Sequence, residues 1–72
     1  MTKSEFVQRV EAAGYSFEDI NVIFNAYTLY KGKKEKYTAI ALVELCENND
    51  AKTLNNLYNE SLELMRSKGA RL

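Results

Sequence analysis

The chain contains no histidine, proline or tryptophan, and its only cysteine is Cys46. Without histidine and with a single thiol, the usual nitrogen and sulfur ligands of a tetrahedral zinc site cannot be assembled within one chain, and no internal disulfide can form. The absence of histidine also removes the side chain whose unperturbed pKa lies nearest neutrality, together with the nucleophile arrangements that depend on it. We therefore expect no metal, no cofactor and no enzymatic activity.

A large enclosed pocket is not expected either. A chain of 72 residues buries only about 60% of the surface that its unfolded form exposes. A pair of carboxylates can act as acid and base, but only within a pocket, and so small a core seldom encloses the volume that a ligand occupies. We expect a single helical domain over residues 1–72, without catalytic residues and without a small-molecule substrate.

Long apolar runs and an excess of one charge are also missing. No segment approaches the roughly 20 apolar residues that span a bilayer, and the first residues, MTKSEFVQRV, lack the apolar stretch of a signal peptide. We expect a cytoplasmic protein that does not bind membranes. The formal net charge is zero, which gives no support to a general polyanion-binding protein.

What the chain does contain is a strong helical pattern. Apolar residues make up 46% of it, and the absence of proline leaves Gly14, Gly32 and Gly69 as the breaks between segments of helical length. The pattern predicts an all-α fold, a compact four-helix domain in which the second helix is central. The expected helices span about residues 3–13, 17–30, 34–48 and 51–68.

Local signals mark several helix ends. Thr2 can cap the first helix with Glu5 at the capping-box position, and Gly14 suits the residue just past its end. Ser16 is the expected cap of the second helix, and Asp50 or Asn49 that of the fourth.

The second helix is apolar over most of its circumference, which is typical of a helix packed on several sides. Its second apolar stripe consists of Val22, Ala26 and Leu29, and one chain of this size need not cover all three. The third segment contains KYTAIALVEL, which can be drawn as a strand, but its length and alanine content favour a helix. Such a helix buries Cys46 and places Ile40 on its charged side.

A basic turn separates the second and third segments. In YKGKKEKY, clustered ammonium groups can hold phosphates, and the flanking tyrosines can stack on unpaired bases. The simpler interpretation is a solvated turn whose lysines favour the negative end of the preceding helix dipole, and the zero net charge favours it. The candidate partner-binding residues of this turn, for protein or nucleic acid, are Tyr30, Lys31, Lys33, Lys34, Lys36 and Tyr37.

A second candidate face is the uncharged polar line on the second helix. Side-chain amides on one helix face can pair with adenine edges or with the backbone of a partner protein. The alternative is that a central helix must expose some face to water, and this is its only polar one. The line consists of Glu18, Asn21, Asn25 and Thr28.

The loop between the first two segments resembles that of ubiquitin-associated domains, which are three-helix modules. Ala13, Gly14 and Tyr15 occupy this loop and are followed by Ser16 and an acidic pair. Alanine stands where those domains have methionine, and the fourth helix has no counterpart. The resemblance implies no more than an example of how a small helical bundle can bind a protein.

Two functional hypotheses follow. The first is a non-enzymatic protein-binding module, such as an inhibitor, adaptor or regulatory protein that occludes or bridges a larger protein, with a homodimer as its simplest form. Seven asparagines and seven lysines are compatible with an AT-rich coding sequence, and so with a phage or mobile-element origin. The alternative is a nucleic-acid-binding protein that uses the turn from Lys31 to Lys36 with the flanking tyrosines.

Overall fold

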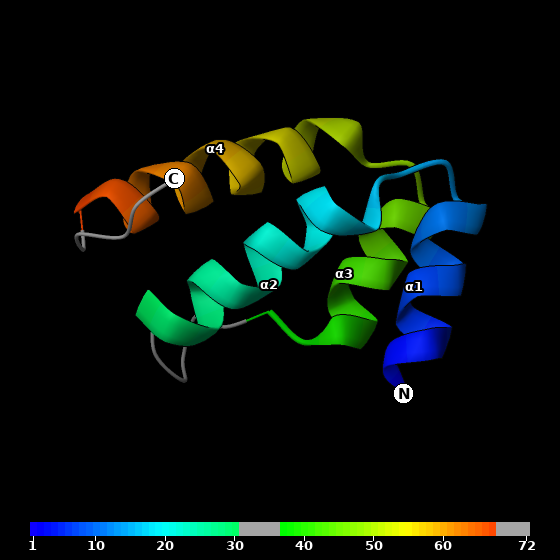
Figure 1. The fold of residues 1–72 in the computed structure, drawn as a ribbon. Helices are drawn as coiled ribbons and strands as arrows, with labels where there is room; N and C mark the ends of the chain where they lie inside the picture. The colour runs from blue at the N-terminus through cyan, green and yellow to red at the C-terminus, as the bar shows by residue number, and fades with distance from the viewer. Residues whose placement is uncertain (31–36, 68–72) are drawn as a thin grey trace.

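The computed structural model describes residues 1–30 and 37–67, and every regular element in this part of the chain is a helix. The helices are α1 (Lys3–Ala12), α2 (Phe17–Tyr30), α3 (Ala39–Glu47) and α4 (Ala51–Ser67) (Figure 1). The predicted all-α, compact four-helix domain is confirmed. Among the described residues, the bounds of α1, α2 and α4 agree with the prediction to within one residue.

The start of α3 differs from the prediction. The helix was expected from about Lys34, but it begins at Ala39, and Tyr37 and Thr38 lie outside it. Thr38 is extended (φ −78°, ψ 160°), and its hydroxyl accepts a hydrogen bond from the backbone N–H of Ala41 at 3.1 Å. This is the geometry of an N-cap, in which a non-helical residue satisfies a free N–H of the first turn. Lys34 itself lies outside the described residues.

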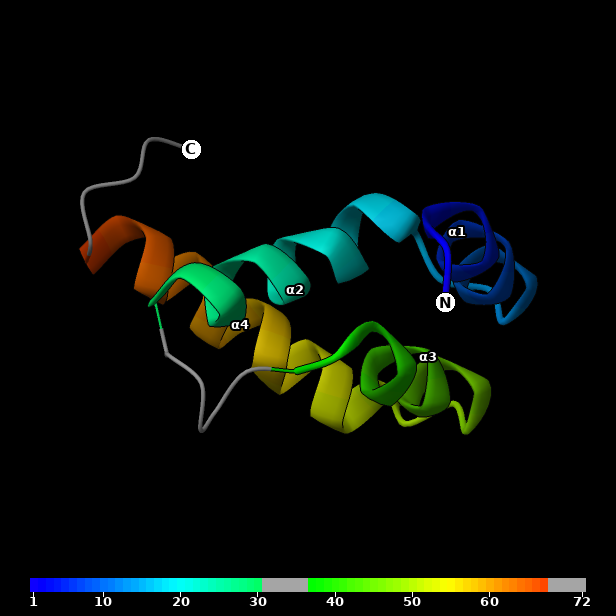
Figure 2. The same cartoon turned by 90° about the horizontal axis from the view of Figure 1, so that it is seen from below.

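The four helices form two pairs that lie across one another. α2 and α4 run side by side along the long dimension of the molecule, and α1 and α3 lie side by side at one end (Figures 1 and 2). α2 contacts each of the other three helices, which confirms its central position. α3 also contacts each of the other three helices, whereas α1 and α4 share no contact within the described residues.

The core is built from the apolar faces of all four helices. Ser61 is its buried polar member, and the Ser61 hydroxyl donates to the backbone carbonyl of Leu57 at 2.7 Å, so it carries no unsatisfied hydrogen-bonding group. The apolar core residues are Phe6, Val10, Ile20, Ile23, Ala26, Tyr27, Leu42, Val43, Cys46, Leu54 and Leu57.

α1 and α3 end in the same way. Gly14 (φ 92°) and Asn49 (φ 55°) follow the two helices in the left-handed region. The backbone N–H of Tyr15 then donates to the carbonyl of Val10 at 3.2 Å, and that of Asp50 donates to Leu45 at 3.1 Å, as in Schellman motifs. The Tyr15 hydroxyl donates to Asn49 Oδ1 at 2.8 Å. One hydrogen bond therefore joins the loops that follow α1 and α3.

The outer face of α2 is more open than its composition suggested. Ala26 is buried and Val22 is half-buried, but Leu29 is 70% exposed. The expectation that one chain would not cover all three is thereby confirmed. Ile40, which was placed on the charged side of its helix, is 53% exposed, and Cys46 is buried as predicted.

Candidate functional site

The basic turn is described only at its two ends. Its lysines lie outside the described residues, while Tyr30 and Tyr37 are half-buried. The ring of Tyr37 packs edge-to-face with Tyr27, with centroids 5.1 Å apart. Tyr27 is itself buried, and its hydroxyl donates to Glu60 Oε1 on α4 at 2.6 Å. Tyr37 is therefore packed against the core instead of standing free to stack on a base.

The polar line on α2 faces outward, as predicted. Glu18, Asn25 and Thr28 are exposed, and Asn21 is half-buried. Asn21 differs from the other three because it also borders a hollow at the end of the molecule where α1, α2 and α3 meet. The structure therefore separates one member of this candidate face from the rest.

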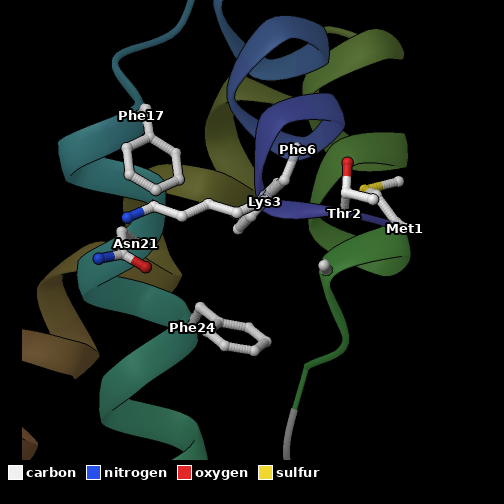
Figure 3. A pocket seen from close by; sticks show the side chains of 8 residues that line it. Met1, Thr2, Lys3, Phe6, Phe17, Asn21 and Phe24 are labelled. Carbon is white, nitrogen blue, oxygen red and sulfur yellow. The ribbon is translucent and has the colours of Figure 1, made fainter.

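This hollow, which we call the phenylalanine hollow, has a volume of about 370 Å³ and opens to solvent. All three phenylalanines of the chain line it. Figure 3 shows Phe17 and Phe24 on α2 facing α1 across the opening. The residues that line the hollow are Met1, Thr2, Lys3, Phe6, Phe17, Asn21, Phe24 and Ala39.

The three rings hold one another in place. Phe6 is buried, and it contacts Phe17 edge-to-face with ring centroids 5.4 Å apart and Phe24 with centroids 6.1 Å apart. Such T-shaped pairs contribute about 0.5–1.5 kcal/mol each beyond the area that they bury. Phe17 and Phe24 are seven residues apart, so they lie two turns apart on the same side of α2. Phe6 thus anchors both half-buried rings from the core side.

The polar groups of the phenylalanine hollow come from α1 and α2. The Lys3 side chain extends from α1 toward Phe17 and Asn21 (Figure 3). Within the described residues, no carboxylate forms an ion pair with Lys3. No other charged side chain lines the hollow. An apolar surface with one cation and one amide at its edge is suited to binding an amphipathic group.

An ion pair joins α1 to α3, which are two of the three helices that line the phenylalanine hollow. Arg9 on α1 donates from Nε to Glu47 Oε2 at 3.0 Å and from Nη2 to Oε1 at 2.8 Å. The hydrogen bonds from Arg9 lower the pKa of the Glu47 carboxyl, and the same hydrogen bonds raise the pKa of the Arg9 guanidinium. Two parallel bonds fix the relative orientation of the side chains more strongly than one.

A second, smaller hollow of about 220 Å³ lies between the first turns of α2 and α4. Its polar groups come from Tyr15, Asp19, Asn55 and Tyr58, over a base of isoleucine and leucine side chains. The Tyr15 hydroxyl is already bound to Asn49. This hollow has less volume than the phenylalanine hollow.

The remaining reactive groups of the described residues do not form a site. Cys46 is 1% exposed, and burial raises the pKa of its thiol, which keeps it protonated. Within residues 1–30 and 37–67, no three acidic, cysteine or histidine side chains are grouped so that they could hold a metal. None of the helices, over the same residues, combines the length and apolar character that a membrane-spanning segment requires.

Comparisons with known proteins add no family: no protein-family model, no curated protein and no solved structure matches the chain. The resemblance of its first loop to ubiquitin-associated domains therefore gains no support. The site must be argued from its own residues.

Sequence reasoning missed the phenylalanine hollow. The available signal was that Phe17 and Phe24 share one side of α2 while Phe6 lies on the apolar face of the preceding helix. Nothing in the helical periodicity shows that these two faces leave a gap between them. The size of the domain argued against a pocket of several hundred cubic ångströms, but the structure has an open one at its end.

Proposed function

We propose that this protein is a small protein-binding module that acts by occluding or bridging a larger partner, as an inhibitor, adaptor or regulatory protein does. The observation that carries the proposal is the phenylalanine hollow, where every phenylalanine of the chain lines one solvent-accessible surface. Aromatic side chains in pockets are enriched among the residues that dominate binding energy at protein interfaces.

The dimensions of the hollow suit a side chain of a partner. Its volume of about 370 Å³ lies near the lower end of the range of about 300–1,000 Å³ found for ligand pockets. An aromatic ring, leucine or methionine of another protein fits such a space. Burying a side chain of this kind contributes about 1.5–3 kcal/mol, so further contacts around the opening must supply the rest of the affinity.

An exposed apolar side chain at the opening supplies such a contact. Met1 lines the hollow and is 45% exposed. Ile40, the residue after the lining residue Ala39, is 53% exposed. Exposed apolar surface beside a hollow is a pattern that marks interaction sites on small soluble domains.

The nucleic-acid alternative has less support. Its lysines lie outside the described residues, and Tyr37, one of its two stacking residues, packs against the buried Tyr27. Its test is a gel shift with the wild-type chain and with a variant in which Lys31, Lys33, Lys34 and Lys36 are replaced by glutamine. A complex that weakens steeply with salt and is lost in the variant would favour this alternative over ours.

Affinity purification with three baits tests the protein-binding proposal. The baits are the wild-type chain, Asn21→Trp, which places a bulky uncharged ring at the edge of the hollow, and Asn56→Trp. Asn56 is exposed on α4, so its variant makes the same chemical change on a distant surface. We expect the wild type and N56W to recover a common protein from a lysate of the source organism and N21W to lose it.

Two results would contradict the proposal. One is the recovery of the same proteins by all three baits, which would mean that no partner depends on the hollow. The other is the absence of any partner together with a strictly monomeric sedimentation profile, which would also exclude self-association.

A further inference from the structure

We infer that the partner of this module presents an apolar side chain with a carboxylate beside it. The apolar side chain enters among the phenylalanines, and the carboxylate pairs with Lys3. This inference rests on the proposed function and names the chemistry of the partner segment.

The charge of the phenylalanine hollow is the first argument. The chain as a whole has no net charge, but the side chains that line the hollow include one cation, Lys3, and no acid. Lys3 is exposed and has no ion-pair partner among the described residues. A partner with a negative group at this position is therefore complementary, and one with a positive group is repelled.

The apolar surroundings determine which anion fits. Three phenyl rings and the Met1 side chain supply the large apolar groups of the lining. A carboxylate can pair with the Lys3 ammonium while the apolar group beside it contacts the rings, whereas a phosphate dianion brings more charge to be desolvated beside apolar surface, which is costly. The Asn21 side chain, half-buried at the edge of the hollow, can donate a second hydrogen bond from its amide. An aspartate or glutamate close to an aromatic, leucine or methionine residue meets these requirements.

The contribution of the charge is expected to be modest. Exposed ion pairs are weak because water screens them, and a pair that the bound segment partly shields from water is stronger. We therefore expect the carboxylate to raise the affinity about threefold to tenfold over a neutral group of the same shape. The apolar contacts provide the larger part of the binding energy.

Two small probes separate these contributions. Hydrocinnamate carries a phenyl ring and a carboxylate, and hydrocinnamamide is its neutral isostere. Each is titrated into the folded protein while the backbone amide resonances are followed by NMR. The proteins are the wild type, Lys3→Gln and Lys52→Gln, where Lys52 is an exposed lysine on α4 far from α1.

We expect both probes to shift the amide resonances of Phe17, Asn21 and Phe24. The anion should bind the wild type and K52Q about threefold to tenfold more tightly than the amide, and this preference should vanish in K3Q. Equal affinities for both probes in the wild type, or a preference that persists in K3Q, would overturn the inference and leave the proposed function standing. If neither probe shifts these resonances, the hollow does not admit an apolar group, and the proposed function fails as well.

A second copy of the chain is the competing occupant, and sedimentation distinguishes it. A wild-type dimer that dissociates in N21W but persists in N56W would show that the hollow binds another copy of this protein, and would overturn the inference of an acidic partner segment. A monomeric wild type across the concentrations used in the titrations is the result that the inference requires.

Discussion

The guanidinium of Arg9 and the carboxylate of Glu47 meet through two hydrogen bonds, the shorter with Nη2 and Oε1 2.8 Å apart. The two residues are 38 positions apart in the sequence, so the contact joins α1 to α3 directly. α1 supplies Lys3 and Phe6 to the phenylalanine hollow, and α3 supplies Ala39. The ion pair thus joins two of the three helices that line the proposed binding surface.

The first prediction concerns the pH dependence of this ion pair. The pKa of Glu47 is lowered in the folded state by the hydrogen bonds from Arg9. A lowered carboxyl pKa stabilises the fold above the pKa of the unfolded chain, and this contribution is lost as the pH falls through the folded-state value. Glu47→Gln should therefore lower the thermal midpoint at neutral pH but change it less in acid.

The effect should be small and sensitive to salt, because both side chains are about two-fifths exposed, at 43% and 41%. Thermal unfolding of the wild type and E47Q between neutral and acidic pH measures it. Glu63→Gln, on exposed α4 surface, serves as the control. A difference between wild type and E47Q that grows as the pH falls would show that the direction of the pKa shift is wrong.

The second prediction concerns the start of α3. Thr38→Ala removes the hydroxyl that accepts from the Ala41 N–H at 3.1 Å, so it should reduce the free energy of unfolding by about 1 kcal/mol. Thr38→Ser keeps the acceptor and should retain most of the stability. Urea unfolding of the three proteins measures the difference. Equal losses in both variants would mean that the hydroxyl does not cap the helix.

The third prediction concerns the end of α1. Gly14 has a φ of 92°, which residues with a Cβ rarely adopt, and an added Cβ would meet no atom within 4 Å. Gly14→Ala should therefore destabilise the fold by about 1–2 kcal/mol through backbone strain alone. Gly14→Asn should cost less, because asparagine tolerates positive φ better. Chemical denaturation tests this order, and an alanine variant as stable as the wild type would contradict it.

The fourth prediction separates the buried phenylalanine from the half-buried ones. Phe6 is 6% exposed and contacts both other rings. Phe6→Ala should cost about 3–5 kcal/mol, a large part of the stability of so small a domain. Phe24→Ala, at a half-buried position, should cost clearly less and leave a folded protein with a wider hollow. Circular dichroism during denaturation gives both values, and equal losses would contradict the assigned roles.

Much of the fold follows from local signals in the sequence. Thr2 caps α1 by accepting from the Glu5 N–H at 3.2 Å, Gly14 ends that helix, and Asp50 accepts from the Thr53 N–H at 3.3 Å. Each signal acts within four residues of the backbone group that it satisfies, so periodicity and capping rules are enough to locate it. The start of α3 was missed because Thr38 was not recognised as its N-cap.

The candidate site could not be predicted in the same way. Periodicity assigns Phe6 to one helix face and Phe17 and Phe24 to another, but the gap between these faces depends on how α1 crosses α2. That crossing depends on contacts between the two helices, such as those of Phe6 with Phe17 and Phe24. Sequence reasoning placed Asn21 among the candidate residues for its polar character, and only the structure places it beside the hollow.

The central claim is that the phenylalanine hollow is the surface that meets the partner. The most direct test is photo-crosslinking with benzoylphenylalanine at one of three exposed positions. These are Ile40, which directly follows the lining residue Ala39, Leu29 on the outer face of α2, and Asn56 on α4. The account predicts an adduct from position 40 with the same protein that the N21W bait loses, and none from position 56. Adducts from position 29 or 56 without one from position 40 would contradict it.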